Sequence, residues 1–219
     1  MSQQRLRATF VKGPQLKYIS HLDLALAWER ALRRAGVPLA YSQGHNPQAR
    51  LQLASGLPVG YTGAAEVMDI ILSQPMPPGE FMARVRPALP EGLSVTDAEE
   101  VPLKGPSLQS ALREAVYMTR VETSLQADEL TQRIANLLAA DQLVQQRTRK
   151  QRLENFDLRP LMKDVWLEAH GEHHIQLGMR LCAGQQGNVR PDAVLAALGL
   201  ADAYVQVERI RLMFEFDSL

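Results

Sequence analysis

The order of its strand-like and helix-like segments constrains this chain more than any single motif does. RLRATFVKG, residues 5–13, alternates basic and apolar residues as a half-buried strand does, and Gly13-Pro14 ends it. A helix is expected next. Turn-rich pieces then separate segments that predict three strands, a short helix and a last strand, namely VPLAYS, ARLQLAS, AEVMDIILS, PPGEFMARVRPALP and GLSVTDAEEVPL. This order is typical of a sheet with helices on one face.

The same order begins again after KGPSL, residues 104–108, which we interpret as a domain boundary. The second half reads as a strand, an amphipathic helix, a basic strand, a hairpin, a helix and a long final strand, namely AVYMTRVET, ADELTQRIANLLAAD, LVQQRTRK, DVWLEAHGEHHIQLGMRLC, RPDAVLAALGL and YVQVERIRLMFEF. Two copies of one plan predict an α+β protein of two ferredoxin-like (βαββαβ-type) halves with antiparallel sheets. The expected domains are residues 1–106, with the SHLD helix and the GHNP loop, and residues 107–219, with the basic RTRK strand.

Composition excludes several classes of protein. Of the 219 residues, 46% are apolar and 22% are charged, as in an ordinary globular protein with room for two small domains. No apolar run reaches the roughly 20 residues that a membrane helix needs. The N-terminal MSQQRLRATFVKG lacks the apolar centre of a secretion signal, so we expect a cytoplasmic protein without a membrane partner.

Metal and cofactor sites are not predicted. The single cysteine, Cys182, excludes an internal disulfide and any multi-cysteine zinc or iron–sulfur site made by this chain alone. Three histidines lie within five residues, but neighbours in a hairpin point to opposite faces, which disfavours a shared metal ion at His170, His173 and His174. We therefore expect no cofactor.

Residues 20–38 carry the signals of a well-capped helix. Ser20 fits an N-cap, and Asp23 takes the third helical position in place of the usual Glu of a capping box. Gly36 and Pro38 end the helix. An i, i+4 core stripe is expected among Leu22, Leu24, Leu26, Trp28, Ala31, Leu32 and Ala35.

Positive charge is segregated along the chain although the net charge is zero. Residues 1–60 carry eight Lys or Arg against two acids, and residues 147–163 carry six against two, so the local balances are +6 and +4. Such surfaces attract anions, and an exposed tyrosine can stack on a base, so RNA or a ribosomal particle is the predicted partner. The helix arginines equally fit dipole compensation and packing of their stems. The predicted nucleic-acid-binding residues are Arg30, Arg33, Arg34, Tyr41, Gly44, His45, Asn46, Arg50, Arg147, Arg149, Lys150 and Arg152.

Two histidines raise the question of catalysis. In RNA cleavage without a metal, a histidine takes the proton of a 2′-hydroxyl while a lysine or second histidine assists the leaving oxygen. His21 with Lys17 fits these roles, as does His45 with Arg50. A histidine beside an N-cap is also explained by structure alone, so His21 and Lys17 are candidate catalytic residues only for an alternative function.

Several separated motifs point to one family. They are SHLDLALAWERALRRAGVPLAYSQGHNP from residue 20, LPVG from 57, the E-x-x-DI of Glu66 to Ile70, RTRK from 147, the DLRP of Asp157 to Pro160 and the G-x-x-RP of Gly187 to Pro191. Together they resemble the radical SAM-linked bacterial family, domain of unknown function 2344. That family usually has a GFNPHP-like loop, whereas here His45 replaces the Phe and Gln48 the His. This departure argues against an essential histidine in the loop.

The resemblance implies a role beside another enzyme. Members are fused to, or encoded beside, B12-binding radical SAM proteins, and their genes neighbour those for a ribonuclease of the G/E type and for ribosomal proteins. Radical SAM chemistry needs three cysteines, so this chain would serve a radical SAM protein in trans. We expect a non-catalytic RNA- or ribosome-binding accessory protein that positions an RNA substrate. The alternatives are a metal-independent RNA endonuclease, since the doubled plan also resembles CRISPR repeat-processing proteins, and a protein–protein adaptor without RNA affinity.

Overall fold

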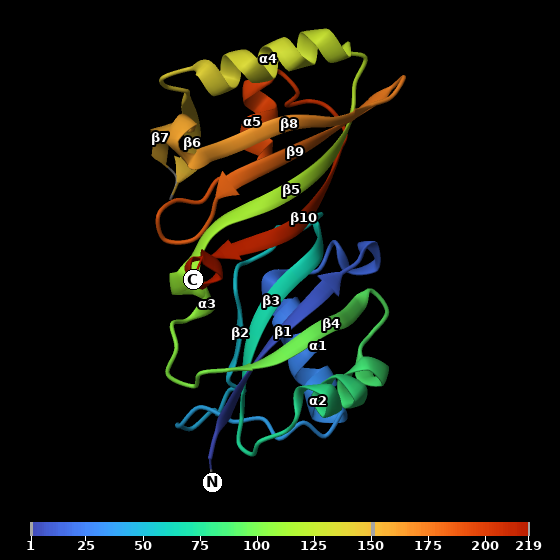
Figure 1. The fold of residues 1–219 in the computed structure, drawn as a ribbon, viewed down its shortest axis with the longest axis vertical. Coiled ribbons are helices and arrows are strands. Elements are labelled where there is room, and N and C mark those ends of the chain that lie inside the picture. Colours follow the sequence, from blue (N-terminus) through green and yellow to red (C-terminus); the bar gives the residue numbers. More distant parts are fainter. Residues whose placement is uncertain (1, 150–151, 219) are drawn as a thin grey trace. The chain divides into compact units, whose positions relative to one another are not determined.

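The structure, a computed structural model, describes residues 2–149 and 152–218, and the side chains of residues 147–149, 152, 217 and 218 are left out of the description. The chain forms two compact units. Unit 1 comprises Met1–Leu112 with Phe214–Leu219, and unit 2 comprises Arg113–Met213. Both mix helices with antiparallel strands (Figure 1), which confirms the predicted α+β class. No helix in the described part of the chain is long and apolar enough to cross a membrane.

Unit 1 is a sheet of four strands with two main helices. Its strands follow the order β4-β1-β3-β2, and each neighbouring pair is antiparallel. Short 3-10 turns follow β1 at Pro14–Leu16, follow α2 at Arg86–Ala88 and close the chain at Glu215–Ser218. Its other elements are β1 (Gln4–Lys12), α1 (His21–Arg34), β2 (Leu51–Leu53), β3 (Thr62–Leu72), α2 (Pro78–Val85), β4 (Leu93–Val101) and α3 (Leu108–Ala111).

Both main helices of unit 1 pack on the same face of the sheet. Alternate residues of β1 point into this core, and Trp28 of α1 meets the ring of Phe10 edge-on at a centroid distance of 5.0 Å. Phe81 and Val85 bring α2 into the same cluster. The predicted N-cap is confirmed, since the Ser20 hydroxyl accepts a hydrogen bond from the Asp23 amide at 3.2 Å. The helix therefore begins where the sequence predicts.

The segment between α1 and β2 differs from its prediction. VPLAYS forms no regular strand, only isolated bridges from Leu39 to Leu72 and from Tyr41 to Ala49. The Ala40 amide bonds to the Ile71 carbonyl of β3 at 2.8 Å, but proline at position 38 has no amide hydrogen to donate and Gly44 adopts a φ of 131°, so the pairing with β3 stays short. Residues 41–48 are exposed as a result.

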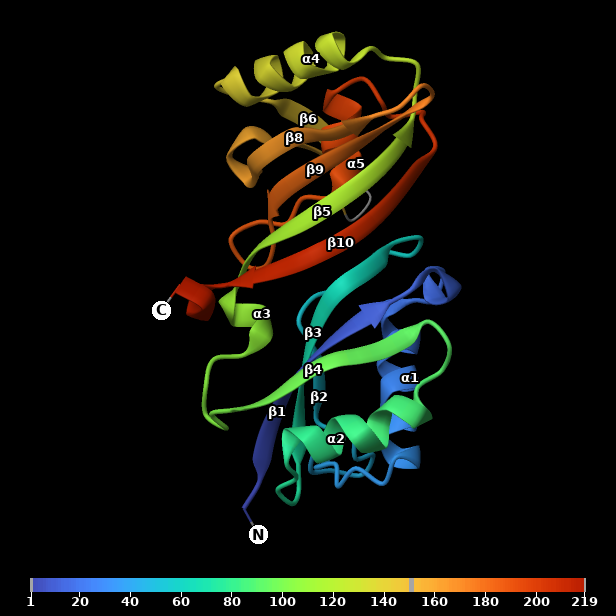
Figure 2. The same cartoon turned by 45° about the vertical axis from the view of Figure 1, so that its right-hand side comes forward.

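Unit 2 repeats the order of elements seen in unit 1. Its main sheet follows the order β10-β5-β9-β8, with α4 packed along β8 (Figure 2). The Glu122 amide at the end of β5 bonds to the Tyr204 carbonyl at the start of β10, so these strands are antiparallel as well. A short turn, Arg159–Leu161, precedes β8. The elements are β5 (Leu112–Glu122), α4 (Ala127–Ala139), β6 (Val144–Arg149), β7 (Arg152–Asp157), β8 (Met162–His170), β9 (His174–Cys182), α5 (Pro191–Ala197) and β10 (Val205–Phe214).

Two hairpins extend unit 2. The hairpin of β8 and β9 turns where the sequence predicts it, with the Gly171 amide bonded to the His174 carbonyl at 2.8 Å. The basic strand β6 was predicted alone, but it pairs with β7 in a separate two-stranded sheet. Asp157 Oδ1 fixes the base of this hairpin by accepting from the Leu143 and Arg159 amides at 2.8 and 3.0 Å.

Candidate functional site

Five exposed arginines gather at one end of unit 1, and we call this surface the arginine end. The last turns of α1 and the end of α2 adjoin there. Arg34 donates to the Ala88 carbonyl at 2.5 Å, and a Cβ at Gly36 would lie 4.0 Å from Arg84 Nη1. The arginine end consists of Arg30, Arg33, Arg34, Arg84 and Arg86. The sequence predicted the first three, whereas the two from α2 and its following turn were missed.

The arginine end keeps a net positive charge. Glu29 approaches Arg33 at 3.9 Å and Glu80 pairs with Arg84, so five cations face two carboxylates and the balance is +3. The Arg33 side chain is still 66% exposed. Both pairs are surface pairs at i, i+4 spacing, which contribute little to stability and yield readily to another anion. The surface can therefore contact phosphates.

The predicted loop residues lie together between α1 and β2. The Ser42 amide bonds to the Gln48 carbonyl at 2.9 Å, so residues 42–48 form an exposed turn that carries Gly44, His45 and Asn46. Tyr41 is exposed at one side of this turn. Arg50 is also exposed, and it donates to Gln3 Oε1 at 3.0 Å. His45 thus sits on an outward turn.

The remaining predicted arginines belong to unit 2. Arg147 and Arg149 lie on β6, and Arg152 begins β7 in register with Arg149. Lys150 lies outside the described residues, as do the side chains of the three arginines. The backbone accordingly places the three arginines at one end of the paired strands β6 and β7.

The two candidate catalytic residues stand at the start of α1, where the SHLD and LPVG motifs meet. The Lys17 carbonyl accepts from the Gly60 amide at 2.7 Å, and its ammonium lies 4.9 Å from the centre of the Tyr18 ring. His21 Nδ1 is buried without a hydrogen-bond partner, and a Cβ at Gly56 would meet the ring at 3.9 Å. Among the described residues no hydrogen bond joins His21 to Lys17.

One face of α1 carries exposed apolar side chains. The predicted core stripe is right for Leu24 and Trp28, but Leu22 is 78% exposed and Leu26 is 42% exposed. Residues two positions apart on a helix are turned by about 200°, so these leucines point away from the core. Tyr18 lies in the turn before α1 and is also exposed. We call Tyr18, Leu22 and Leu26 the apolar stripe.

The sheet face of unit 1 that lies opposite the core is charged. Because side chains alternate along β1, Leu6 and Ala8 point into the core while Arg5 and Arg7 point to the other face. The strand register places these arginines in two rows across the sheet. The rows are Gln52, Asp69, Arg7 and Glu99, and Arg50, Ile71, Arg5 and Val101. We call this surface the charged sheet face.

A buried ion cluster forms the centre of the charged sheet face. Arg5 Nε donates to Asp69 Oδ2 at 3.0 Å, and Arg7 Nε donates to Asp69 Oδ1 at 3.0 Å. Arg5 and Asp69 are almost fully buried. Two guanidinium groups share one carboxylate, so the cluster keeps one net positive charge. Such a cluster is stable only while all its partners are present.

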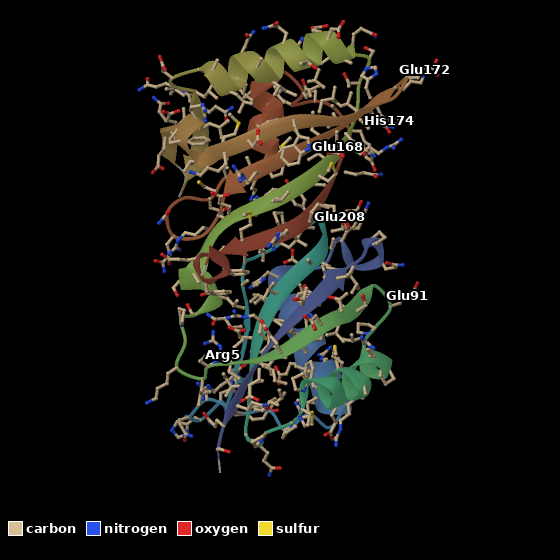
Figure 3. The ribbon with its side chains drawn as sticks, viewed as in Figure 1. Arg5, Glu91, Glu168, Glu172, His174 and Glu208 are labelled. Carbon is tan, nitrogen blue, oxygen red and sulfur yellow. The ribbon has the colours of Figure 1, made fainter. Side chains whose placement is uncertain are left out.

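Arg5 also fixes the segment that follows β4. It donates to the carbonyls of Pro102, Gly105 and Pro106 at 3.4, 3.0 and 2.8 Å. Figure 3 labels Arg5 where β1 passes beside this segment. We call residues 102–107 the linker segment, and these bonds hold it across the charged sheet face.

Two cavities open on the charged sheet face, and Arg5 and Gly105 line both of them. One has a volume of about 350 Å³, and the other has about 430 Å³ and is bounded by Phe216. The sequence prediction named Arg50 of the lining of the smaller cavity but missed the other residues. Basic residues at alternate positions of β1 and an aspartate within the apolar β3 are the signals that could have shown this site.

Metal binding finds no support in the described part of the chain. No group of three His, Cys, Asp or Glu side chains there is close enough to hold a metal ion. His170 Nε2 instead lies 3.0 Å from the Leu125 carbonyl, and His173 approaches Glu172 at 3.9 Å on the exposed turn.

Comparison with known families identifies the chain. Residues 5–191 match the family described as an uncharacterized protein conserved in bacteria (DUF2344), and the chain belongs to this family. The match begins at Arg5 and runs through the SHLD helix to Pro191, so it includes the charged sheet face and the arginine end. It confirms the membership of DUF2344 that the sequence motifs predicted. None of the curated proteins compared matches the chain.

Solved structures are similar at low identity. A chain of a Cbf5-Nop10-Gar1 complex is 12% identical with a TM-score of 0.47, over 93% of this chain and 48% of that one. A chain of an H/ACA RNP bound to a substrate RNA containing 2′-deoxyuridine is 10% identical with a TM-score of 0.46, over 93% and 47%. This chain therefore spans about half the length of both. An unknown protein from Galdieria sulphuraria is 11% identical with a TM-score of 0.27, over 96% and 100%. Likenesses at these TM-scores carry no argument about function.

Proposed function

We propose that this protein is a non-catalytic RNA-binding accessory protein and that the arginine end of unit 1 contacts the phosphate backbone. The observation that carries the proposal is the meeting of five exposed arginines, from two helices, with only two carboxylates. Arginine donors match phosphate oxygens, and each contact releases counterions from the nucleic acid. The excess of positive charge at the arginine end is what such binding requires.

The fold proposal is that each unit is a ferredoxin-like half. The order β4-β1-β3-β2 in unit 1 and the order β10-β5-β9-β8 in unit 2 support it, since each unit runs strand, helix, strand, strand, helix, strand. The β6 and β7 hairpin is then an insertion in the second half. The expected domains, residues 1–106 and 107–219, differ from the two units, because the division falls after Leu112 and Phe214–Leu219 belongs to unit 1.

Other predicted residues are proposed as further RNA contacts, within each unit separately. Tyr41 offers an exposed ring for base stacking, and the turn of Gly44, His45 and Asn46 exposes backbone and side-chain polar groups beside it. Arg50 and the arginines of β6 and β7 supply further phosphate contacts. We also propose a cytoplasmic location and, from the family resemblance, a radical SAM protein in trans, for which this chain positions RNA.

Salt-dependent binding tests the RNA proposal. Fluorescence anisotropy with tRNA and rRNA fragments should show affinity that falls as salt rises. Arg33→Glu with Arg86→Glu should weaken binding and lower the slope of log K against log salt by about 2, one for each lost contact. Arg120→Glu with Arg211→Glu, at two exposed positions on strands of unit 2, is the control with an equal change of charge. Equal affinity of both double variants would contradict the proposal.

A protein–protein adaptor is the second candidate, and the apolar stripe favours it. Large exposed side chains on one helix face mark interaction surfaces. Arg30 and Arg33 continue the line of Leu22 and Leu26 along α1, so the matching partner surface is apolar with acidic side chains at one end. We assign this partner as the radical SAM protein. For an adaptor without RNA affinity, Leu22→Glu with Leu26→Glu should abolish a complex seen by analytical ultracentrifugation, and an unchanged complex would contradict the assignment.

A metal-independent endonuclease remains the alternative for the start of α1. It requires His21 to reach an RNA hydroxyl with Lys17 nearby, and since Nδ1 is buried without a hydrogen-bond partner, Nε2 is the nitrogen that would take the proton. The test is incubation of RNA with the protein in the presence of a metal chelator. Cleavage that His21→Ala removes without loss of folding supports an enzyme, whereas intact RNA with the natural protein excludes one.

A further inference from the structure

We infer that the cavity of about 350 Å³ on the charged sheet face binds a nucleoside monophosphate unit, either as one residue of an RNA strand or as a free nucleotide. The RNA source rests on the proposed function, but the lining of the cavity shares no residue with the arginine end, and the cavity supplies recognition of a base. We call it the Gln52 cavity. Its lining residues are Arg5, Arg50, Leu51, Gln52, Asp69, Ile71, Leu103, Gly105 and Ser107.

The size and rigidity of the Gln52 cavity suit a small ligand. Pockets for such ligands usually have volumes of roughly 300–1,000 Å³ and exist before the ligand binds. Arg5 holds the linker segment by three carbonyl bonds, and the Ser107 hydroxyl caps α3 by accepting from the Ser110 amide at 3.1 Å. The wall opposite the sheet is therefore fixed, and little ordering is needed on binding.

The charge of the cavity favours a phosphate. The lining carries two guanidinium groups, those of Arg5 and Arg50, and Asp69 pairs with Arg5, so the charge of Arg50 is left without a counter-charge in the lining. Asp69 is the only carboxylate in the lining, and both of its oxygens already accept from arginine. Arg50 donates one bond to Gln3, which leaves most of its five N–H donors for an incoming phosphate.

The same cavity offers groups for a base. Leu51, Ile71 and Leu103 supply apolar surface, and Leu103 is 42% exposed at the rim, where a flat ring can cover it. Gln52 presents an amide that has no hydrogen-bond partner among the described residues. An amide carries both a donor and an acceptor, which is the pattern that reads a base edge. One ligand class satisfies the phosphate, apolar and amide groups together, and that class is a nucleotide.

The larger cavity is the poorer candidate for the same ligand. Glu99 lines it, so an incoming phosphate would meet a carboxylate there. Phe216 bounds it from the side and already covers the Arg7 guanidinium at 4.3 Å. The inference therefore concerns the Gln52 cavity alone.

Nuclear magnetic resonance of the full ¹⁵N-labelled chain tests the inference. The four 5′-nucleoside monophosphates, the matching nucleosides and inorganic phosphate are titrated separately, and the Gln52 side-chain amide and Arg50 Nε signals are followed. Monophosphates should shift both signals, nucleosides the Gln52 signal more weakly, and inorganic phosphate the Arg50 signal alone. Single-stranded oligonucleotides should move the same two signals if the ligand is part of RNA.

Single variants test the base contact of Gln52 and the phosphate contact of Arg50 separately. Gln52→Leu should weaken monophosphate affinity about tenfold, the cost of one buried hydrogen bond to a ligand. Arg50→Gln should remove the difference between monophosphates and nucleosides. Gln74→Leu, at an exposed position of unit 1, is the matched control and should leave the affinity unchanged. Arg86→Gln should weaken binding of oligonucleotides and leave that of monophosphates unchanged.

The outcomes distinguish this inference from the proposed function. Millimolar monophosphates that shift neither signal, or equal affinity in Gln52→Leu, would overturn the nucleotide site even where RNA binding by the arginine end is observed. Monophosphate binding without any affinity for RNA would uphold the site with a free nucleotide as its ligand, and would overturn the RNA-binding proposal instead.

Discussion

The guanidinium of Arg7 lies 4.3 Å from the centre of the Phe216 ring, so a residue near the start of the chain packs on one near its end. Phe216 is itself stacked on Phe214 at a centroid distance of 5.0 Å. Arg7 meanwhile holds Asp69 through two hydrogen bonds. The C-terminal segment is thus a structural part of the charged sheet face.

Replacement of Phe216 should lower the stability of the protein. Phe216→Ala removes a cation–π contact and an aromatic pair, which together contribute about 1–2 kcal/mol. Phe216→Leu keeps apolar contact and should lose about half as much. Urea unfolding followed by circular dichroism measures both variants, and equal stability of Phe216→Ala and the natural protein would refute the contact.

Removal of the Asp69 carboxylate should destabilise the protein more than replacement of Phe216. Asp69→Asn leaves Arg5 buried beside Arg7 without a counter-charge, and the loss of one partner from a buried pair costs about 3–5 kcal/mol. Asp202→Asn changes the same charge at an exposed position and should have almost no effect. Thermal and urea unfolding of the two variants give the comparison. Similar midpoints would show that the cluster does not stabilise unit 1.

Removal of the N-cap of α1 should cause a smaller loss of stability. Ser20→Ala removes the acceptor for the Asp23 amide and should cost about 1 kcal/mol, whereas Ser20→Thr keeps the hydroxyl and should lose less. The midpoint of urea unfolding reports the difference. A Thr variant as unstable as the Ala variant would mean that the cap hydroxyl is not what stabilises this turn.

A glycine in unit 2 makes room for a tryptophan. A Cβ at Gly178 would lie 2.0 Å from an indole carbon of Trp166, its cross-strand partner. Gly178→Ala should therefore destabilise the protein by about 1–3 kcal/mol through overpacking. Addition of Trp166→Leu should restore much of the loss in a double-mutant cycle. Additive effects of the two changes would contradict the close approach.

Local signals in the sequence predicted much of this fold. Ser20 and Asp23 lie three residues apart, so the start of α1 could be read without any knowledge of the rest of the chain. The turn at Gly171 could be predicted in the same way, because a tight turn also depends only on residues that are neighbours in the sequence. These predictions depend on hydrogen bonds between near neighbours, which the sequence alone specifies.

Features that depend on distant partners were missed. Arg5 and Asp69 are separated by 64 positions, and only the register of β1 with β3 brings them together. The direction of Leu22 and Leu26 was also missed, because a helix with apolar residues on two faces does not reveal which face meets the sheet. Arg84 and Arg86 joined the predicted arginines only through the packing of α2 beside the end of α1.

The division of unit 1 around unit 2 has a consequence for biosynthesis. Unit 2 is one continuous stretch, Arg113–Met213, whereas unit 1 needs Phe214–Leu219 in addition to its first 112 residues. Chains emerge from the ribosome N-terminus first and fold by domains. Unit 2 can fold as soon as it has emerged from the ribosome. Arg7, in contrast, can contact Phe216 only after nearly the whole of this sequence has been translated.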